Sequence, residues 1–231
     1  MLPIMTASLA GVPVFGPVDG IGDIEFLPGN NVPVANAGPD QTVEMTSCAG
    51  AGVALNGSAS SDPDADPLTY TWTENGVTIA TGMDPSVTLA YGTHTITLTV
   101  DDGKGGTATD DVVISIVDTT APLLNVTVSP DTLWTPNHQY VTVTPATTVT
   151  DACVATTTVN LLSVTSNEPD NGLGDGDTPN DIVINENGTI SLRAERSGTG
   201  GGRVYTITYQ ATDAAGNTST ATATVTVPHN Q

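Results

Sequence analysis

Residues 93–100 read THTITLTV, in which threonine alternates with His94, Ile96, Leu98 and Val100. Successive side chains of a β-strand point to opposite faces of the sheet, so this alternation predicts a strand with a threonine face and a mostly apolar face. The period of two leaves no room for a helical interpretation. The sequence therefore predicts a β-sheet at this point.

The same pattern recurs along the chain. It is found at residues 68–72 (LTYTW), 203–213 (RVYTITYQATD) and 219–227 (STATATVTV), and residues 181–192 (DIVINENGTISL) read as a hairpin. The chain has 40 threonines together with abundant valine, and glycine and proline interrupt the alternating runs. β-branched residues between such breakers are typical of strands, so we expect an all-β fold.

The pattern stops and restarts at residues 117–122 (VDTTAP), which marks a domain boundary. Short strands separated by turn signals indicate a β-sandwich on each side of it. We therefore expect two sandwiches in tandem, at residues 33–118 and 119–231.

Residues 1–32 form a distinct apolar segment, here called the arm, which contains no Lys or Arg. A secretory signal would begin with basic residues, and the apolar runs are too short and broken to span a membrane. Regular Gly and Pro predict an extended chain that pairs with an open sheet edge, either of its own chain or, as we favour, of the next copy. Its large apolar side chains are those of Leu2, Ile4, Leu9, Val12, Val14, Phe15, Ile21, Ile24 and Phe26.

The chain is strongly acidic, with 4 Lys and Arg against 25 Asp and Glu and a formal net charge of −21. Such a surface repels the phosphates of nucleic acids and the headgroups of anionic membranes, so we expect neither as a partner. Aspartate dominates among the acids, and it is both a turn residue and a good oxygen ligand for hard cations.

The first block resembles a PKD (polycystic kidney disease) domain, an immunoglobulin-like module. The resemblance rests on the stretches ANAGPDQTV (35–43), VALNGSASSDPDADPLTYTW (53–72), GTHTITLTVDDGKGG (92–106) and ATDDVVISIV (108–117). It implies an immunoglobulin-like sandwich for this block, and together with the strand pattern we expect the fold class of two tandem immunoglobulin-like β-sandwiches with an extended N-terminal arm.

The second block resembles a module of bacterial secreted and cell-surface proteins, with similarity to bacterial immunoglobulin-like and hyalin-repeat modules. The signals are LWTPNHQYV (133–141), SVTSNEPDNGLGDGD (163–177), LRAERSGTGGGRVYTITY (192–209) and ATDAAGN (211–217). Together the two resemblances imply an extracellular or cell-surface protein that works in adhesion, spacing or assembly.

Asp62, Asp64 and Asp66 alternate in a short stretch, and three carboxylates this close suit calcium, which takes six to eight oxygen ligands. The stretch resembles the calcium loop of PKD domains. By position, that resemblance adds Asn36 and Asp101 or Asp102 as ligands. The alternative is a solvated Asp-Pro turn.

A second acidic stretch, SNEPDNGLGDGDTPNDI, occupies residues 166–182. Asp175, Asp177 and Asp181 could bind calcium, or the loop could dock on the nearby arginines through bidentate ion pairs, or it could be solvated. We favour docking because three of the four cations of the chain lie just downstream. These are Arg193, Arg196 and Arg203.

Asp118 at the boundary could form a third cation site with Asp213 and Asn217. In bacterial immunoglobulin-like modules, the stretch that carries Asp118 and the stretch that carries Asp213 and Asn217 often meet at one end of the sandwich. A cation there would stiffen the domain junction. Capping of turns by the same side chains is an equally good interpretation.

Cys48 and Cys153 are the only cysteines, and their spacing matches no zinc or redox motif. An extracellular chain could join them, but they fall in different expected domains. We therefore do not expect an intrachain disulfide.

No catalytic motif is recognisable, and none of the three histidines lies in an HExxH pattern or beside a nucleophile motif. We expect no enzyme. We expect an extracellular structural protein, a filament subunit that assembles with copies of itself through the arm and is stabilised by calcium. The alternative is a non-catalytic glycan- or matrix-binding accessory module of a larger secreted enzyme or adhesin.

Overall fold

The computed structural model describes residues 29–153, 156–170, 179–198 and 201–229. Its regular elements are β-strands, which confirms the predicted all-β fold class. The chain divides into two compact units, the first containing Ala49–Val117 and the residues before Glu44, the second containing Glu44–Cys48 and the residues from Asp118 onward. The described part of the chain contains no helix with the length and apolar character that crossing a membrane requires.

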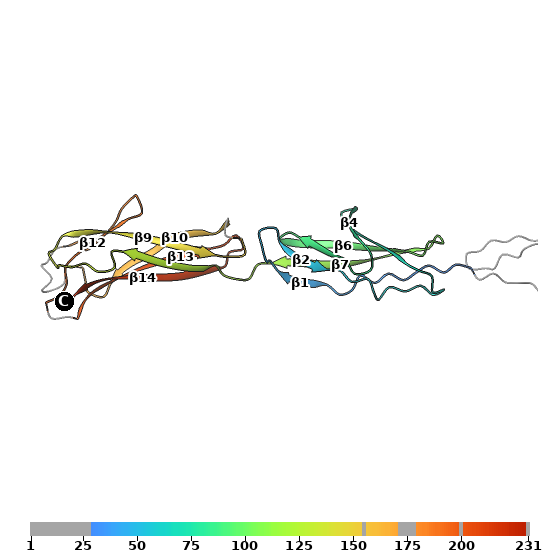
Figure 1. The fold of residues 1–231 in the computed structure, drawn as a ribbon, viewed down its shortest axis with the longest axis horizontal. Helices are drawn as coiled ribbons and strands as arrows, with labels where there is room; N and C mark the ends of the chain where they lie inside the picture. Colours follow the sequence, from blue (N-terminus) through green and yellow to red (C-terminus); the bar gives the residue numbers. More distant parts are fainter. Residues whose placement is uncertain (1–28, 154–155, 171–178, 199–200, 230–231) are drawn as a thin grey trace, which may run out of the picture. The chain divides into compact units, whose positions relative to one another are not determined.

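The first unit consists of two antiparallel sheets (Figure 1). The larger sheet has the strand order β1-β7-β6-β3-β4, and the smaller sheet pairs β2 with β5. The strands are β1 (Gln41–Glu44), β2 (Ala51–Ala54), β3 (Thr69–Glu74), β4 (Val77–Thr81), β5 (Ser86–Leu89), β6 (Gly92–Asp101) and β7 (Thr107–Val117).

Alternation in β6 builds the core of the first unit, as expected. Ile96, Leu98 and Val100 are fully buried, while the threonines between them are not. β3 lies beside β6 and contributes Trp72, which is fully buried and donates from Nε1 to the carbonyl oxygen of Gly82 at 2.9 Å. The indole N–H is therefore satisfied inside an apolar core, as a buried tryptophan requires.

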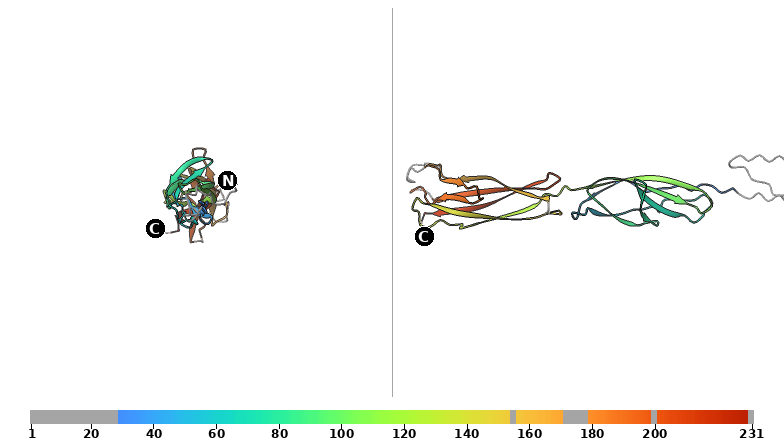
Figure 2. Two further views of the ribbon diagram at one scale, coloured as in Figure 1. Left: turned by 90° about the vertical axis from the view of Figure 1, so that its right-hand side faces the viewer. Right: turned by 90° about the horizontal axis from the view of Figure 1, so that it is seen from above.

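The second unit has two antiparallel sheets that lie in two layers (Figure 2). One sheet has the order β10-β13-β14 and the other the order β11-β12-β9-β8. The strands are β8 (Leu123–Ser129), β9 (Tyr140–Thr150), β10 (Thr158–Ser166), β11 (Ile182–Ile184), β12 (Ile190–Arg193), β13 (Gly202–Thr212) and β14 (Thr218–Pro228).

Side chains from both layers form the core of the second unit. Val143 and Leu192 come from one sheet, and Tyr205, Ile207 and Val225 from the other. The hairpin predicted around Asn187-Gly188 is present as β11 and β12, with Gly188 in the left-handed region at φ 81°. Only glycine adopts this conformation without steric cost, which is why the turn forms there.

The short segment Glu44–Cys48 belongs to the second unit, although the sequence pattern assigns it to the first domain. The Glu44 carboxylate accepts hydrogen bonds from the backbone N–H groups of Thr119, at 2.7 Å, and Thr120, at 3.1 Å. These bonds hold the pKa of Glu44 below its ordinary value. The backbone bond from Thr119 is the largest contribution, against a smaller opposing effect of burial.

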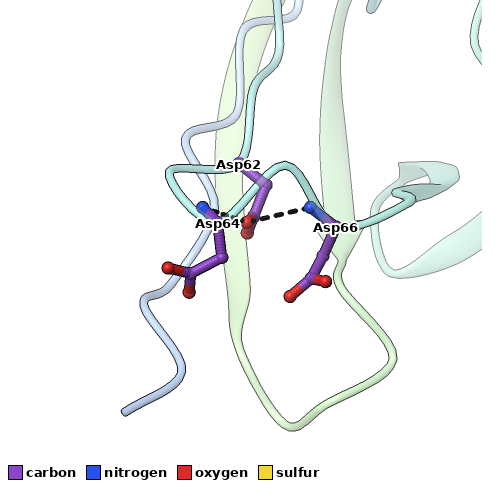
Figure 3. Close-up of side chains that lie close together, drawn as sticks. All are labelled: Asp62, Asp64 and Asp66. Atoms are coloured by element: carbon purple, nitrogen blue, oxygen red, sulfur yellow. Dashed lines mark hydrogen bonds between the residues drawn. The ribbon is translucent and has the colours of Figure 1, made fainter. Parts of the chain in front are cut away.

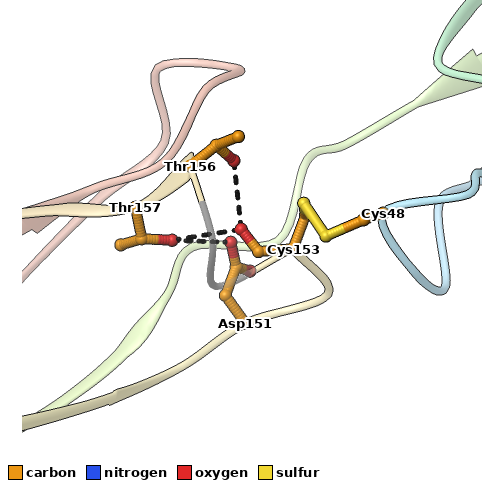
Figure 4. Close-up of a disulfide and its surroundings, with 5 residues drawn as sticks. All are labelled: Cys48, Asp151, Cys153, Thr156 and Thr157. Carbon is orange, nitrogen blue, oxygen red and sulfur yellow. Dashed lines mark hydrogen bonds between the residues drawn. A yellow bond between two sulfur atoms is a disulfide. The ribbon is translucent and has the colours of Figure 1, made fainter.

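A disulfide joins Cys48 to Cys153, so our expectation of no intrachain disulfide is wrong (Figure 4). The expectation failed because it placed Cys48 in the first domain, whereas the segment that carries it is part of the second unit. The bond closes a sequence separation of 105 residues. A structural disulfide is typical of proteins that fold in an oxidising compartment.

Candidate functional site

The first acidic cluster consists of Asp62, Asp64 and Asp66, in the loop between β2 and β3. One carboxylate oxygen of each lies within 4.8 Å of the others. Asp62 lies between the other two, and its Oδ1 accepts hydrogen bonds from the backbone N–H of Asp64 at 2.8 Å and of Asp66 at 3.2 Å (Figure 3). This turn gathers the three like charges.

Two oxygens of the first cluster are buried without a donor. Asp62 Oδ2 and Asp66 Oδ2 have no hydrogen-bond partner among the described residues, and the Asp66 side chain is only 10% exposed. Lys104 Nζ lies 2.5 Å from the other oxygen of Asp66. One lysine offsets three carboxylates only in part, so the cluster keeps a negative charge and two oxygens that a cation could use.

Asn31, which we assigned to the arm, contacts the first cluster. It donates to Asp64 from its backbone N–H at 2.7 Å and from Nδ2 at 2.9 Å. The backbone bond, followed by the side-chain bond, holds the pKa of Asp64 below its ordinary value. The end of the arm nearest the sandwich therefore helps to keep this carboxylate charged.

Asp101 does not belong to the group of carboxylates that have an oxygen within 4.8 Å of one another, and the Asn36 side chain is engaged in a turn. Asn36 Oδ1 accepts from the backbone N–H of Gly38 at 2.9 Å, and Asp101 Oδ1 accepts from that of Gly103 at 2.7 Å. Both side chains cap turns in the way that Asn and Asp commonly do.

Asp102 is buried and organises the turn between β6 and β7. Its Oδ1 accepts from the backbone N–H groups of Lys104, at 2.7 Å, and Gly106, at 2.9 Å, and its Oδ2 accepts from Asn30 Nδ2 at 2.7 Å. The bond from Asn30, then the backbone bonds, hold the pKa of Asp102 below its ordinary value despite burial. Asp102 thus has a structural partner for each oxygen.

The second acidic cluster brings together Asp118, Asp151 and Asp213, again with one oxygen of each within 4.8 Å of the others. Asp118 is 8% exposed and Asp213 is 6% exposed. Burial, followed by the nearby charges of Asp213, Asp151 and Glu44, raises the pKa of Asp118. Burial acts in the same direction on Asp213, but hydrogen bonds from Asn217 and from the backbone of Gly216 and Ala215 together outweigh it and lower the pKa of Asp213.

Asn217 supports the second cluster as a donor. Its Nδ2 donates to Asp213 Oδ2 at 2.9 Å and to the carbonyl oxygen of Asp118 at 3.0 Å, and its backbone N–H donates to Asp213 Oδ1 at 2.8 Å. The structure thus joins the three residues that we grouped from the sequence. Asn217 holds the two aspartates in place by these bonds.

Asp151 is the member of the second cluster that the sequence interpretation missed. It follows β9, and its Oδ2 accepts from Thr157 Oγ1 at 3.3 Å (Figure 4). Its Oδ1 is buried and has no hydrogen-bond partner in the described part of the chain. No local sequence pattern marks Asp151 as a ligand, because its place beside Asp118 and Asp213 depends on the fold.

The arginines gather carboxylates at another place in the second unit. Arg203 is fully buried and pairs with Asp181, and its Nε lies 3.3 Å from Glu168 Oε2. Arg193 Nε lies 3.4 Å from Asp181 Oδ1. Burial tends to lower the pKa of Arg203, but the bond to Asp181 outweighs burial and raises this pKa. Burial also raises the pKa of the neighbouring Tyr205 to about 12.

The arrangement of Asp181 between two guanidinium groups favours docking on arginine over calcium for this residue. Asp175 and Asp177 lie outside the described residues. Arg196 is bound to backbone instead, donating from Nε to the carbonyl oxygen of Pro228 at 3.1 Å and from Nη2 to that of His229 at 3.0 Å.

Two layers of antiparallel strands in each unit define a tandem of immunoglobulin-like β-sandwiches. Residues 30–116 match the family model of the PKD domain, so the first unit is a PKD domain. The chain therefore carries a module typical of secreted and cell-surface proteins, and PKD domains are typically non-catalytic. No curated protein matches the chain.

The solved structures that match the chain include the following three. The PKD1 domain of Vibrio anguillarum Epp is 29% identical, over 38% of this chain and 100% of that chain, with a TM-score of 0.29. Human protocadherin-24 EC1-2 is 18% identical, over 88% of this chain and 100% of that one, with a TM-score of 0.34. A nucleoside hydrolase-related hypothetical protein from Saccharophagus degradans is 25% identical over 41% of this chain, with a TM-score of 0.33, and only 28% of that protein is covered.

Proposed function

We propose that the chain is a non-catalytic structural module of a secreted or cell-surface protein, and that calcium at its two acidic clusters stabilises its units. The second cluster is the observation that carries the calcium part. Its three carboxylates converge, and no Lys or Arg of the described residues forms an ion pair with them.

The ligand chemistry of the second cluster fits calcium. The grouped residues are aspartates alone, and calcium prefers oxygen ligands, whereas zinc favours histidine and cysteine. Asp118 and Asp213 are buried, and Asp151 adds a buried oxygen without a donor in the described ranges. Burial of like charges is costly, so a bound cation would offset the repulsion among them.

The first cluster supports the same proposal by a second route. Its Asp62 and Asp66 each have a buried oxygen that no donor reaches in the portion described. Lys104 already neutralises one charge there. We therefore expect the first cluster to bind calcium more weakly than the second.

Calcium titration of the chelator-treated chain tests the proposal. Calcium that binds the folded state raises the melting temperature by mass action, and extracellular modules bind it at about 10⁻⁴–10⁻³ M. Hydrogen exchange in β6 and β13 would separate the responses of the two units. We expect Asp151→Asn to abolish the response of β13 and to leave that of β6.

The exposed Asp84 offers a matched control, since Asp84→Asn removes the same charge away from both clusters. This variant should respond to calcium like the wild type. A melting temperature that neither chelation nor added calcium changes would show that the clusters bind no calcium.

We also propose that the chain assembles with copies of itself through the arm, residues 1–32, on the basis of the arm's sequence. Its apolar side chains favour burial, and a sheet edge of another copy would offer both burial and backbone hydrogen bonds. A contact of this kind between different surfaces is head-to-tail and can grow into a filament.

Deletion of residues 1–28 tests assembly, because it spares Asn30 and Asn31 and their bonds to the first unit. Electron microscopy should show filaments of the full chain and none of the deletion variant. An unchanged calcium response would show that the deletion variant is folded. Filaments of normal length without the arm would rule out its role.

A further inference from the structure

The ion-pair cluster of the second unit contains more carboxylates than guanidinium groups. Glu168, Asp181 and Glu195 supply three acids, and Arg193 and Arg203 supply two cations. Both cations lie against Asp181, and Arg203 also binds Glu168. Glu195 is therefore the carboxylate with the weakest compensation.

Glu195 has no solvent to compensate for this, because it is 0% exposed. Its nearest guanidinium atom, Arg193 Nε, lies 3.9 Å from Oε2, which is beyond hydrogen-bonding distance. Its Oε1 and Asp181 Oδ1 are both buried, and neither has a hydrogen-bond donor among the residues described. A fully ionised Glu195 would be a buried charge whose one direct side-chain contact is the imidazole of His138, and an ion buried with so little pairing is strongly unfavourable.

The carboxyl groups of Asp181 and Glu195 gather around one atom, Arg193 Nε, which lies 3.4 Å from Asp181 Oδ1 and 3.9 Å from Glu195 Oε2. Two ionised carboxylates in this position repel, whereas one proton between them forms a hydrogen bond, as in coupled carboxyl pairs. A metal ion fits poorly, because Arg193 and Arg203 already place two positive charges against Asp181. A proton, unlike a metal ion, fits between the two carboxyl groups without any additional space.

Several other groups face this carboxyl pair from the elements packed around it. His138, in the loop before β9, lies with Nδ1 3.0 Å from Glu195 Oε2, and its side chain is 54% exposed. Tyr205 of β13 donates from its hydroxyl to the carbonyl oxygen of Arg193 at 2.8 Å. Tyr140 of β9 stacks on Arg193, with the ring centroid 4.2 Å from the guanidinium carbon. His138 thus links the buried pair to solvent.

The same cluster fixes the chain on both sides of residues 171–178. Arg203 Nη2 donates to the carbonyl oxygen of Pro169 at 3.4 Å, and Arg193 Nη2 donates to that of Pro179 at 3.1 Å. Asp170 accepts from the backbone N–H of Asp181 at 2.9 Å. Whatever disturbs the charge balance of the cluster therefore acts on the start of β11.

We propose that the second unit holds one proton between Asp181 and Glu195, and that this proton locks the ion-pair cluster and the start of β11. Loss of the proton leaves two adjacent buried carboxylates ionised, and their repulsion loosens this end of the sandwich. The second unit is then a pH-dependent latch, tight in mild acid and weaker as the pH rises.

The direction follows from the folded and unfolded pKa values of Glu195. Burial, then the bond to Asp181, raises the folded pKa above its ordinary value of 4.5. A group with a raised pKa contributes stability that is complete below the unfolded pKa and is lost as the pH rises through the folded pKa. Each pKa unit of the shift corresponds to about a tenfold change in the folded-to-unfolded ratio.

Carbon-13 NMR of the Glu195 carboxyl group in the full wild-type chain tests the proposal without any substitution. We expect Glu195 to titrate above 4.5, and the amide signals of β11 to sharpen in its acidic limit. His138→Ala removes a hydrogen-bond contact that lowers the pKa of Glu195, so this pKa should rise further. Titration at or below the ordinary value would overturn the proposal.

Glu195→Gln provides the second measurement, because an amide supplies a permanent donor to Asp181 without a titrating proton. Hydrogen exchange at Ile182–Ile184 should slow with falling pH in the wild type, after correction for intrinsic exchange, and should be constant in the variant. Exchange in β6 of the first unit is the internal control. An equal pH dependence in the wild type and in Glu195→Gln would also overturn the proposal.

Discussion

At the scale of single residues, His94 shows how the alternating strand also carries a charge-dependent contact. Its Nδ1 lies 2.6 Å from Glu74 Oε1, and its Nε2 lies 2.9 Å from the carbonyl oxygen of Ala90. Burial would lower the pKa of His94, but these two bonds outweigh it and raise the pKa above 6.5. Both ring nitrogens of His94 therefore have a hydrogen-bond partner.

We expect the first unit to lose stability as the pH rises above 6.5, because His94 then gives up the proton that binds it to Glu74. Glu74→Gln should lower the pKa of His94 and cost about 1 kcal/mol below that pH. Proton NMR of the imidazole gives the pKa, and denaturant unfolding gives the stability. An unaltered imidazole titration in the variant would contradict this view.

Asp102 gives a second prediction for a single side chain. Asp102→Ala removes the acceptor for the N–H groups of Lys104 and Gly106 and for Asn30, and donors buried without a partner are unfavourable. We expect the melting temperature of the first unit to fall by several degrees. Asp101→Ala, which removes one exposed turn contact, is the matched control and should have a much smaller effect.

At the scale of elements, alternation predicted the long strands well, because one buried face dictates the side-chain pattern of β6, β13 and β14. Segment Glu44–Cys48 escaped prediction, because its place depends on hydrogen bonds to Thr119 and Thr120, far along the chain. Asp151 escaped for a related reason. Asp151 joins the second acidic cluster because β9 ends beside Asp118 and Asp213. No local sequence pattern shows that these three residues lie close together.

The disulfide gives a prediction at this scale. Reduction of Cys48–Cys153 frees Glu44–Cys48 from the turn after β9, and loss of a native disulfide typically costs about 2–4 kcal/mol. We expect a reductant to lower the melting temperature of the second unit and to weaken calcium binding at Asp151. The double variant Cys48→Ser/Cys153→Ser should match the reduced protein and be insensitive to reductant. Identical melting of the oxidised and reduced chains would contradict the prediction.

At the scale of the whole molecule, the net charge of −21 is poorly balanced by internal cations. Lys104 pairs with Asp66, Arg193 and Arg203 pair with buried acids, and Arg196 binds backbone oxygens. The surface of the described residues is thus acidic, as the composition predicted. The net charge follows from the sequence, but the location of the ion pairs does not, because each pair joins residues that only the fold brings together.

Mutual repulsion of surface carboxylates favours the unfolded chain, and salt screens it over a Debye length of about 10 Å at 0.1 M. In the presence of chelator, we therefore expect the melting temperature to rise when sodium chloride increases from about 0.05 to 0.5 M.

Calcium bound at the clusters should act at far lower concentration than sodium, because it is held by specific oxygens. Magnesium chloride at matched ionic strength separates screening by divalent ions from binding, since magnesium demands a more rigid octahedral site. A melting temperature that falls with sodium chloride would show that attractive ion pairs, such as those of Arg203, outweigh the repulsion among the excess carboxylates.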